Sequence, residues 1–220
     1  MAGTEEGRGG GAGPGEEPFR PVTLETAGGP LSLRYYPAAG ARAAAVYAGG
    51  VGGGWDTPSQ GLYPRLSEEL AREGIAGVRV RFRHPTVLDE AVADVLAAAR
   101  FLREEEGVGT LGLVGHSFGG AVVIRAAAEE PAVATVVTLA TQGYGTEPVA
   151  RLGPRCSILL VHGTGDEVLA AASSQHVHAL AREPRQLVVY PAAGHGLDEV
   201  AADVYDDVRR WLRAALRPEG

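Results

Sequence analysis

The pentapeptide Gly115-His116-Ser117-Phe118-Gly119 joins two stretches of contrasting pattern. The apolar run Leu111-Gly112-Leu113-Val114 before it is typical of a buried strand, and residues 120–126 after it favour a helix. A G-x-S-x-G pattern between a strand and a helix predicts a sharp, strained turn that presents the serine hydroxyl at the end of the strand. Glycines on both sides allow the strand and the helix to approach closely. We therefore expect Ser117 to act as a nucleophile rather than as a structural turn residue.

The rest of the chain alternates in the same way between strand-like and helix-like segments. A hairpin of residues 22–26 and 31–36 comes first, and the helices are predicted at 61–73, 86–106, after Ser117, at 173–182 and at 198–216. Further strands are predicted at 43–48, 75–82, 111–114, 134–140, 157–162 and 186–190. Strands that alternate with helices indicate an α/β fold with a mostly parallel sheet that is covered on both faces.

The helix predicted for residues 86–106 carries one apolar face. Leu88, Val92, Val95, Ala99 and Leu102 recur at helical spacing. Charged residues, Asp94 among them, lie off that face, and we expect them to form a solvated surface.

Composition excludes several classes of protein. The chain has 220 residues, of which 45% are hydrophobic and 21% charged, and its net charge is −7 with arginines dispersed along it. No basic cluster indicates nucleic-acid binding, and no apolar run has the roughly 18 residues of a membrane helix. Cys156 is the single cysteine, so an internal disulfide and a cysteine metal cluster are excluded. With no secretory signal pattern at the N-terminus, we expect a cytoplasmic protein.

The N-terminal segment differs from the remainder of the chain. Residues 1–18 are rich in Gly and Glu and lack apolar periodicity, so we predict a disordered tail. Residues 19–220 are then expected to form one domain, which is an ordinary size for a single core.

A serine nucleophile needs a base, and the base needs an acid that fixes its tautomer. In hydrolases with this serine turn, the order along the chain is Ser, then Asp or Glu, then His. Asp166 follows the strand predicted at 157–162, and His195 follows the one at 186–190. Parallel strands end at one edge of a sheet, so we expect Asp166 and His195 to meet Ser117 there as acid and base. Glu167 is the alternative acid.

The other histidines have simpler interpretations. His116 is expected to pack within the serine turn, and His162 to support the Asp166 loop. His84, His176 and His178 are expected on the surface or as satisfied core residues. Since His176 and His178 are two positions apart, they point to different helix faces and do not pair as metal ligands.

Attack on a carbonyl also needs N–H donors for the oxyanion. The backbone N–H of Phe118 is one candidate. The glycine-rich loop 49–54 is expected to supply the other from Gly50 or Val51, because glycine allows the backbone to approach a substrate. A phosphate-binding loop is the alternative, but the lysine of the G-x-x-x-x-G-K-[ST] pattern is absent.

These motifs together resemble the α/β-hydrolase superfamily, and within it the small, lidless serine hydrolases similar to dienelactone hydrolases. The resemblance extends from Val22 to Leu216 and depends on the Ser117 turn, on His162-Gly163-Thr164-Gly165-Asp166 and on Ala193-Gly194-His195-Gly196. It implies an eight-stranded, mostly parallel sheet, with Ser117 as nucleophile, Asp166 as acid and His195 as base. It also implies that no cofactor is needed.

This chain departs from the family pattern at two places. Ala48-Gly49-Gly50 stands where the usual His-Gly follows the third strand, which leaves the second oxyanion donor open. A serine occupies the place of the cysteine nucleophile of dienelactone hydrolases proper, so opening of dienelactone rings does not follow.

The segment between the sixth and seventh strands limits the shape of the site. Residues 141–156 are too few for a cap domain, so we expect an open, shallow site with Trp55, Gln142 and Tyr144 as substrate-binding rim residues. The sequence thus favours hydrolysis of a small-molecule ester, or of a thioester or amide, through an acyl-enzyme on Ser117. A small-molecule receptor or scaffold on the same fold, and a peptidase, are the alternatives. The oligomeric state and the acyl group are left open.

Overall fold

A computed structural model describes residues 18–217. The predicted tail, residues 1–18, lies outside the described residues except for Pro18, so the domain boundary stays a prediction. In chain order the elements are β1 (Arg20–Thr26), β2 (Gly29–Tyr36), β3 (Ala43–Ala48), α1 (Leu62–Arg72), β4 (Ile75–Arg81), α2 (Leu88–Glu104), β5 (Thr110–His116), α3 (Phe118–Glu129), β6 (Val133–Leu139), η1 (Glu147–Arg151), β7 (Ser157–Gly163), α4 (Ala172–Leu180), β8 (Arg185–Tyr190), η2 (Asp198–Val200) and α5 (Ala201–Leu216).

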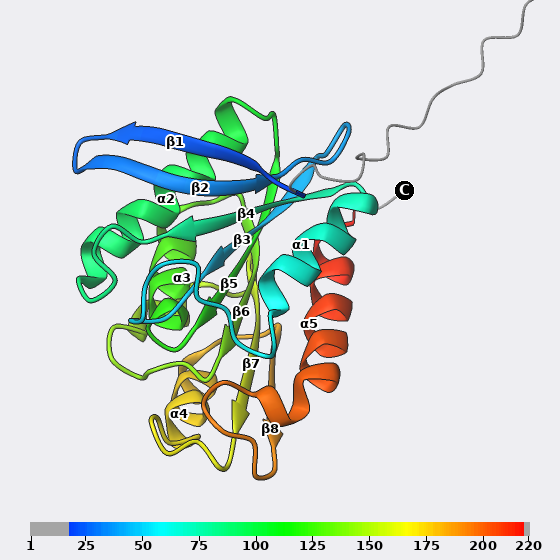
Figure 1. The fold of residues 1–220 in the computed structure, drawn as a ribbon. Helices are drawn as coiled ribbons and strands as arrows, with labels where there is room; N and C mark the ends of the chain where they lie inside the picture. The colour runs from blue at the N-terminus through cyan, green and yellow to red at the C-terminus, as the bar shows by residue number, and fades with distance from the viewer. Residues whose placement is uncertain (1–17, 218–220) are drawn as a thin grey trace, which may run out of the picture.

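The strands form one eight-stranded sheet in the order β1-β2-β4-β3-β5-β6-β7-β8 (Figure 1). Strand β2 runs antiparallel to both of its neighbours, and every pairing from β4 through β8 is parallel. The predicted fold class is therefore confirmed. Because the parallel strands share one direction, their carboxyl ends and the loops that follow them lie along one edge of the sheet.

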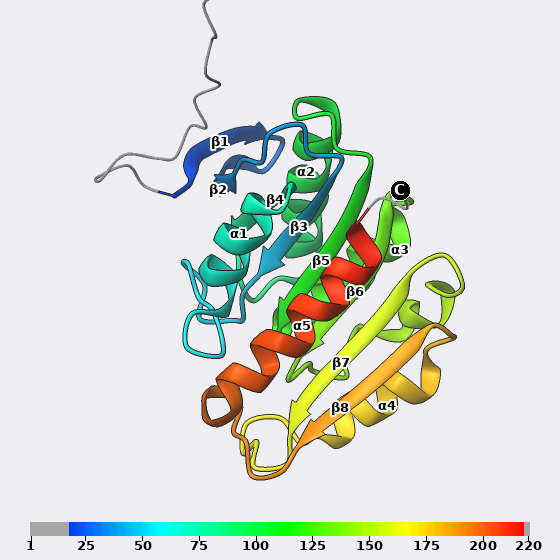
Figure 2. The ribbon, with the colours of Figure 1, turned by 90° about the vertical axis from the view of Figure 1, so that its right-hand side faces the viewer.

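Helices cover both faces of the sheet. Figure 2 shows α1 and α5 on the near face, and α2, α3 and α4 pack on the opposite face. Side chains of β3 alternate between the two cores, with Val46 on the α2 and α3 side and Tyr47 on the α1 and α5 side. Burial on both faces explains why the parallel strands read as continuous apolar runs.

Asp94 corrects the expectation of a solvated surface on α2. Its side chain is 0% exposed and accepts hydrogen bonds from Arg83 Nε at 2.6 Å and from the Arg83 backbone N–H at 2.9 Å. Arg83 also donates to Thr26 Oγ1. The pair therefore links the end of β4 to α2 and to the hairpin, and a charge is tolerated in the interior because it is paired and hydrogen-bonded.

Across the described residues, the connection from β6 to β7 contains only loop and the short helix η1, and no cap domain is inserted there. Within residues 18–217, no helix combines the length and the apolar character needed to cross a membrane.

Candidate active site

The turn between β5 and α3 places Ser117 at the carboxyl edge of the sheet. Ser117 has φ 55° and ψ −117°, a conformation that non-glycine residues rarely adopt, and it is 8% exposed. A Cβ on Gly115 would lie 2.1 Å from the carbonyl oxygen of Gly119. A Cβ on Gly119 would lie 2.4 Å from the carbonyl oxygen of Gly49. The close packing of strand, helix and neighbouring loop is therefore possible only with glycine at both positions.

Asp166 and His195 come together from the loops after β7 and β8. His195 Nδ1 lies 2.7 Å from Asp166 Oδ2, and the Asp166 side chain is 0% exposed. Because a carboxylate accepts at Nδ1, that nitrogen carries the proton, and Nε2 of the neutral ring is free to accept one. Burial alone raises the pKa of Asp166, but hydrogen bonds from His195 and from the backbone N–H groups of Leu169 and Val168 outweigh it, and the pKa is lowered overall.

His116 connects the His195 loop to the serine turn. His116 Nε2 donates a hydrogen bond of 3.0 Å to the carbonyl oxygen of His195, and the centres of the two imidazole rings are 4.8 Å apart. Burial lowers the pKa of His116, which keeps the ring neutral beside His195. Ser117 directly follows His116 in the chain. The contact therefore brings the His195 loop against the serine turn, although no direct hydrogen bond joins Ser117 and His195 within the described residues.

The loop after β3 approaches Ser117 through Gly50. A Cβ on Gly50 would lie 3.5 Å from Cβ of Ser117 and 3.5 Å from Asp56 Oδ2. The Gly50 carbonyl accepts the N–H of Gly53 in a turn, and Val51 is 54% exposed. Within residues 18–217, the backbone N–H groups of Gly50, Val51 and Phe118 donate to no protein acceptor. The oxyanion roles of these three groups stay predictions.

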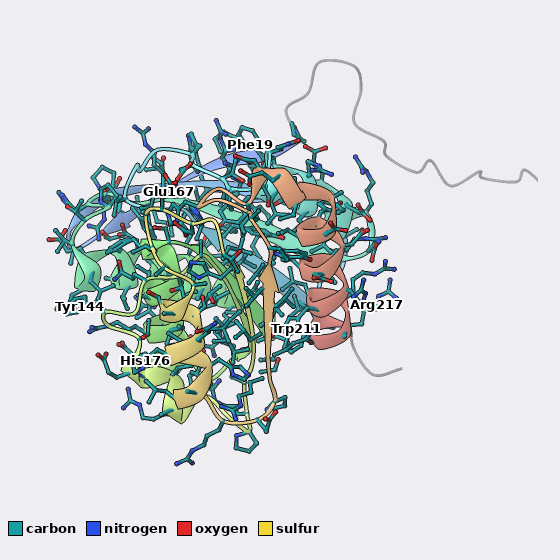
Figure 3. The ribbon with its side chains drawn as sticks, turned by 90° about the horizontal axis from the view of Figure 1, so that it is seen from below. Phe19, Tyr144, Glu167, His176, Trp211 and Arg217 are labelled. Carbon is teal, nitrogen blue, oxygen red and sulfur yellow. The ribbon has the colours of Figure 1, made fainter. Side chains whose placement is uncertain are left out.

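The three predicted rim residues lie in different surroundings. The half-buried Trp55 ring stacks under Arg34, whose Cζ is 4.3 Å from the ring centre, and the Trp55 carbonyl accepts from Arg79. The Gln142 backbone N–H donates to the Ser117 carbonyl at 3.3 Å, which places Gln142 beside the serine turn. Tyr144 is 79% exposed and lies at the periphery of the molecule (Figure 3). Their contacts with a substrate stay predictions.

A set of hydrogen bonds that the sequence patterns do not indicate connects the loop after β3 to the His195 loop. Ser59 donates through its N–H to the Gly196 carbonyl at 2.8 Å and through Oγ to the Leu197 carbonyl at 3.1 Å. Gln60 donates through its N–H to Asp198 Oδ1 at 2.8 Å and through Nε2 to the Asp198 carbonyl at 3.0 Å. We call these four bonds the loop latch. The partners are about 138 positions apart, so no local pattern could reveal them.

The remaining histidines lie apart from this arrangement. His84 pairs with Glu90 on the surface, and α4 carries His176 and His178. In the part of the chain that the structure describes, no group of three or more His, Cys, Asp and Glu residues is arranged to hold a metal ion. His162 contacts the Asp166 carboxylate, as expected for a residue that supports this loop.

Comparison with models of protein families shows to which family the chain belongs. A model of the dienelactone hydrolase family matches residues 41–214, which include β3 through most of α5. The chain belongs to the dienelactone hydrolase family. A dienelactone hydrolase from Anabaena variabilis superimposes with a TM-score of 0.76 at 19% identity, over 91% of this chain and 100% of that chain. The esterase domain of a Rhodothermus marinus protein gives a TM-score of 0.72 at 22% identity, over 90% and 100% of the two chains.

A curated relative matches part of this chain. The uncharacterized protein YfhR of Escherichia coli K12 is 28% identical over 154 residues, which are 57% of this chain and 54% of YfhR. The chain therefore spans about half the length of the curated relatives that it matches, and the two structural likenesses, both below 25% identity, describe the fold.

Proposed function

We propose that this protein is a serine hydrolase that cleaves an ester bond of a small molecule through an acyl-enzyme on Ser117. The observation that carries the proposal is the 2.7 Å hydrogen bond between Asp166 and His195 at the edge where the strained turn presents Ser117. The His116 contact with the His195 carbonyl supports the approach of base and nucleophile. Hydrogen bonds of a catalytic serine are often long without substrate and shorten when substrate binds.

In the proposed reaction, Ser117 Oγ attacks the carbonyl carbon of the ester and transfers its proton to His195 Nε2. Asp166 keeps the proton on Nδ1 and stabilises the imidazolium that forms. His195 then gives the proton to the leaving alcohol, and the acyl group remains on Ser117. A water molecule next attacks the acyl carbon and gives a proton to His195. The Ser117 oxygen leaves with that proton, and the carboxylic acid is released.

The developing negative charge on the carbonyl oxygen needs donors in both steps. We assign the Phe118 N–H as one donor and the N–H of Gly50 or Val51 as the second. Removal of a single oxyanion donor typically lowers turnover by about 10²–10³-fold. The absence of protein acceptors for these N–H groups within residues 18–217 supports the assignment, since a donor already engaged in the fold is not available to a substrate.

An ester is the favoured substrate because a neighbour in fold is the esterase domain of Rhodothermus marinus and the family is named for hydrolysis of a lactone. A thioester or an amide would use the same steps with a different leaving group. The carboxyl edge carries no inserted cap domain within residues 18–217, and such an open edge favours a small or exposed acyl group. A cytoplasmic location stays a prediction from the sequence.

Hydrolysis of p-nitrophenyl esters from acetate to octanoate tests the proposal. We expect wild-type turnover and a loss in Ser117→Ala that approaches about 10⁶-fold, the scale seen when a triad serine is removed from subtilisin. Ser32→Ala is the matched control and should keep full activity, because Ser32 lies on β2, three strands away from β5 in the sheet. Equal hydrolysis by wild type and Ser117→Ala would refute the assignment of the nucleophile.

A second measurement separates an enzyme from a receptor on the same fold. A fluorophosphonate should label Ser117 in the wild type and should not label Ser117→Ala, as read by intact mass and peptide mapping. Stoichiometric labelling together with no turnover on esters, thioesters or anilides would replace the hydrolase proposal with a binding role. Faster turnover of anilides than of esters would indicate a peptidase.

A further inference from the structure

His195 shares its carboxylate partner with a second histidine. Asp166 Oδ2 lies 2.7 Å from His195 Nδ1 and 3.1 Å from His162 Nε2. The other carboxylate oxygen, Oδ1, accepts the backbone N–H groups of Val168 and Leu169, both at 2.8 Å. Both histidines therefore contact the same carboxylate oxygen, Oδ2 of Asp166.

The contacts of the His162 ring fix its tautomer. Nε2 faces two acceptors, Asp166 Oδ2 and the Leu169 carbonyl oxygen, the latter at 2.9 Å, so Nε2 must carry a proton. Nδ1 lies 2.7 Å from Oγ of Ser174 on α4, whose hydroxyl donates to it when the ring is neutral. The His162 and Ser174 side chains are both fully buried, so water does not substitute for either contact.

We infer that His162, held by Ser174, is a positioning residue that withdraws charge from Asp166 Oδ2 and thereby sets the pH range in which His195 acts as a base. The inference rests on the proposed function of the Asp166 and His195 pair. An N–H donor on Oδ2 weakens the attraction of that oxygen for a protonated His195. Its removal strengthens the attraction, so His195 stays protonated to a higher pH and the acid limb of the pH–rate profile moves upward.

Other titratable groups near His195 do not replace this effect. His116, from the end of β5, is kept neutral by burial. Asp198 and Glu199, from η2, accept the backbone N–H groups of Gln60 and Gly194, and Asp56 lies beside Gly50 in the loop after β3. None of these groups hydrogen-bonds to Asp166 or to the His195 ring within the described residues, so they remain in place when His162 is changed.

The test compares variants that remove the donor with one that retains it. His162→Leu removes it, and the double variant His162→Leu/Ser174→Ala also removes the hydroxyl that would otherwise be left buried without a partner. His162→Gln keeps an N–H at the position of Nε2. His176→Leu makes the same substitution on an exposed histidine of α4 and is the matched control.

We expect the acid limb of kcat/KM to move up by about one pH unit, a tenfold change in proton affinity, in His162→Leu and in the double variant. The limb should stay at the wild-type position in His162→Gln and in His176→Leu. The inference would be overturned if kcat falls in the donor-free variants while the acid limb of kcat/KM stays at the wild-type pH. His162 would then have only a structural role. An equal shift in His162→Gln would overturn it too.

A second readout does not depend on turnover. Diethylpyrocarbonate acylates only the neutral imidazole, and His195 is 20% exposed, so the pH dependence of its modification can be followed by peptide mapping. The pH at which His195 is modified at half the maximal rate should rise by about one pH unit in the donor-free variants. If no ester is hydrolysed but this shift is present, the proposed function fails and the role of His162 stands. If esters are hydrolysed and no shift occurs, only the inference fails.

Discussion

Gly119 is the residue at which the serine turn and the loop after β3 lie closest together. A Cβ added there would lie 2.4 Å from the Gly49 carbonyl oxygen and 2.7 Å from the Ala48 carbonyl oxygen. A carbon and a carbonyl oxygen in contact are about 3.3–3.6 Å apart. Gly119→Ala therefore requires a separation of about 1 Å. Both obstacles are backbone atoms, so no side-chain rotation can relieve the overlap.

The expected loss of stability follows from two opposing terms. Overpacking of this kind destabilises by about 1–3 kcal/mol. The change from Gly to Ala near the start of α3 returns up to about 1 kcal/mol of helix propensity. With the full propensity gain, the net loss is up to about 2 kcal/mol, which lowers the Tm of a domain of this size by up to about 8 °C.

We expect Gly119→Ala to reduce activity more strongly than it reduces stability. The first turn of α3 carries the N–H of Phe118, and the loop after β3 carries those of Gly50 and Val51. A 1 Å separation pulls the two oxyanion donors apart, and a misplacement of that size lowers the rate by about 10²-fold. Most of this loss should appear in kcat, because the donors act on charge that develops in the transition state.

Thermal unfolding by circular dichroism and the kcat/KM for an ester identified as a substrate provide the two measurements. Gly143→Ala is the matched control, because its Cβ would meet nothing nearer than 4.0 Å and the residue lies in a loop at the same edge of the sheet. The control should match the wild type in both measurements. If Gly119→Ala keeps kcat/KM within about 3-fold of the wild type, this close approach does not set the positions of the oxyanion donors, and the reasoning that links Gly119 to them is wrong.

Three further outcomes are expected. Asp94→Asn breaks the buried pair with Arg83 and should lower the free energy of unfolding in urea by about 3 kcal/mol. Asp89→Asn, at an exposed carboxylate, should change it by less than about 1 kcal/mol. Equal effects of the two variants would contradict the structural role of Asp94. The pKa of Asp166 is lowered from 3.8, so its contribution to stability is fully present above about pH 4 and is lost as the pH falls through the lower folded-state value. The stability difference between wild type and Asp166→Asn should therefore narrow below pH 4, and a constant difference from pH 6 to pH 2.5 would contradict the shift. Burial raises the pKa of the Cys156 thiol to about 12. Ellman's reagent at pH 8 should therefore react with this thiol only after the protein unfolds. Rapid reaction of the native protein would contradict the burial of Cys156.

Sequence patterns are informative where local spacing sets the structure. The inner parallel strands β4, β3, β5, β6 and β7 are buried on both faces, so largely apolar runs predict them, and the carboxyl ends of parallel strands meet at one edge. For this reason the sequence alone places Asp166 and His195 together, and in the structure His195 Nδ1 lies 2.7 Å from Asp166 Oδ2.

The same patterns fail where a residue depends on a distant partner. Asp94 lies off the apolar face of α2 by helical spacing, and spacing alone predicts exposure. Its burial follows from Arg83, which lies outside the helix and bonds both carboxylate oxygens. Likewise, the place of His162 at a strand end predicts that it supports the Asp166 loop. The sharing of Oδ2 requires the fold, because Ser174 reaches the ring from α4.

The loop latch adds a physical reason for the rigidity of an open site. Ser59 and Gln60 both have φ 51° and Leu197 has φ 57°, so three residues without the freedom of glycine are held in left-handed conformations. Each such conformation costs about 1–3 kcal/mol and persists only where the surrounding structure holds it, as the four latch bonds do here. The latch ties the loop that carries Gly50 to the loop that carries His195, so the proposed oxyanion donor and base move together. Within residues 18–217, no cap domain is inserted between β6 and β7 that could order the site around a substrate. The relative positions of donor and base must then be set before the substrate arrives, and strained turns joined by hydrogen bonds achieve this.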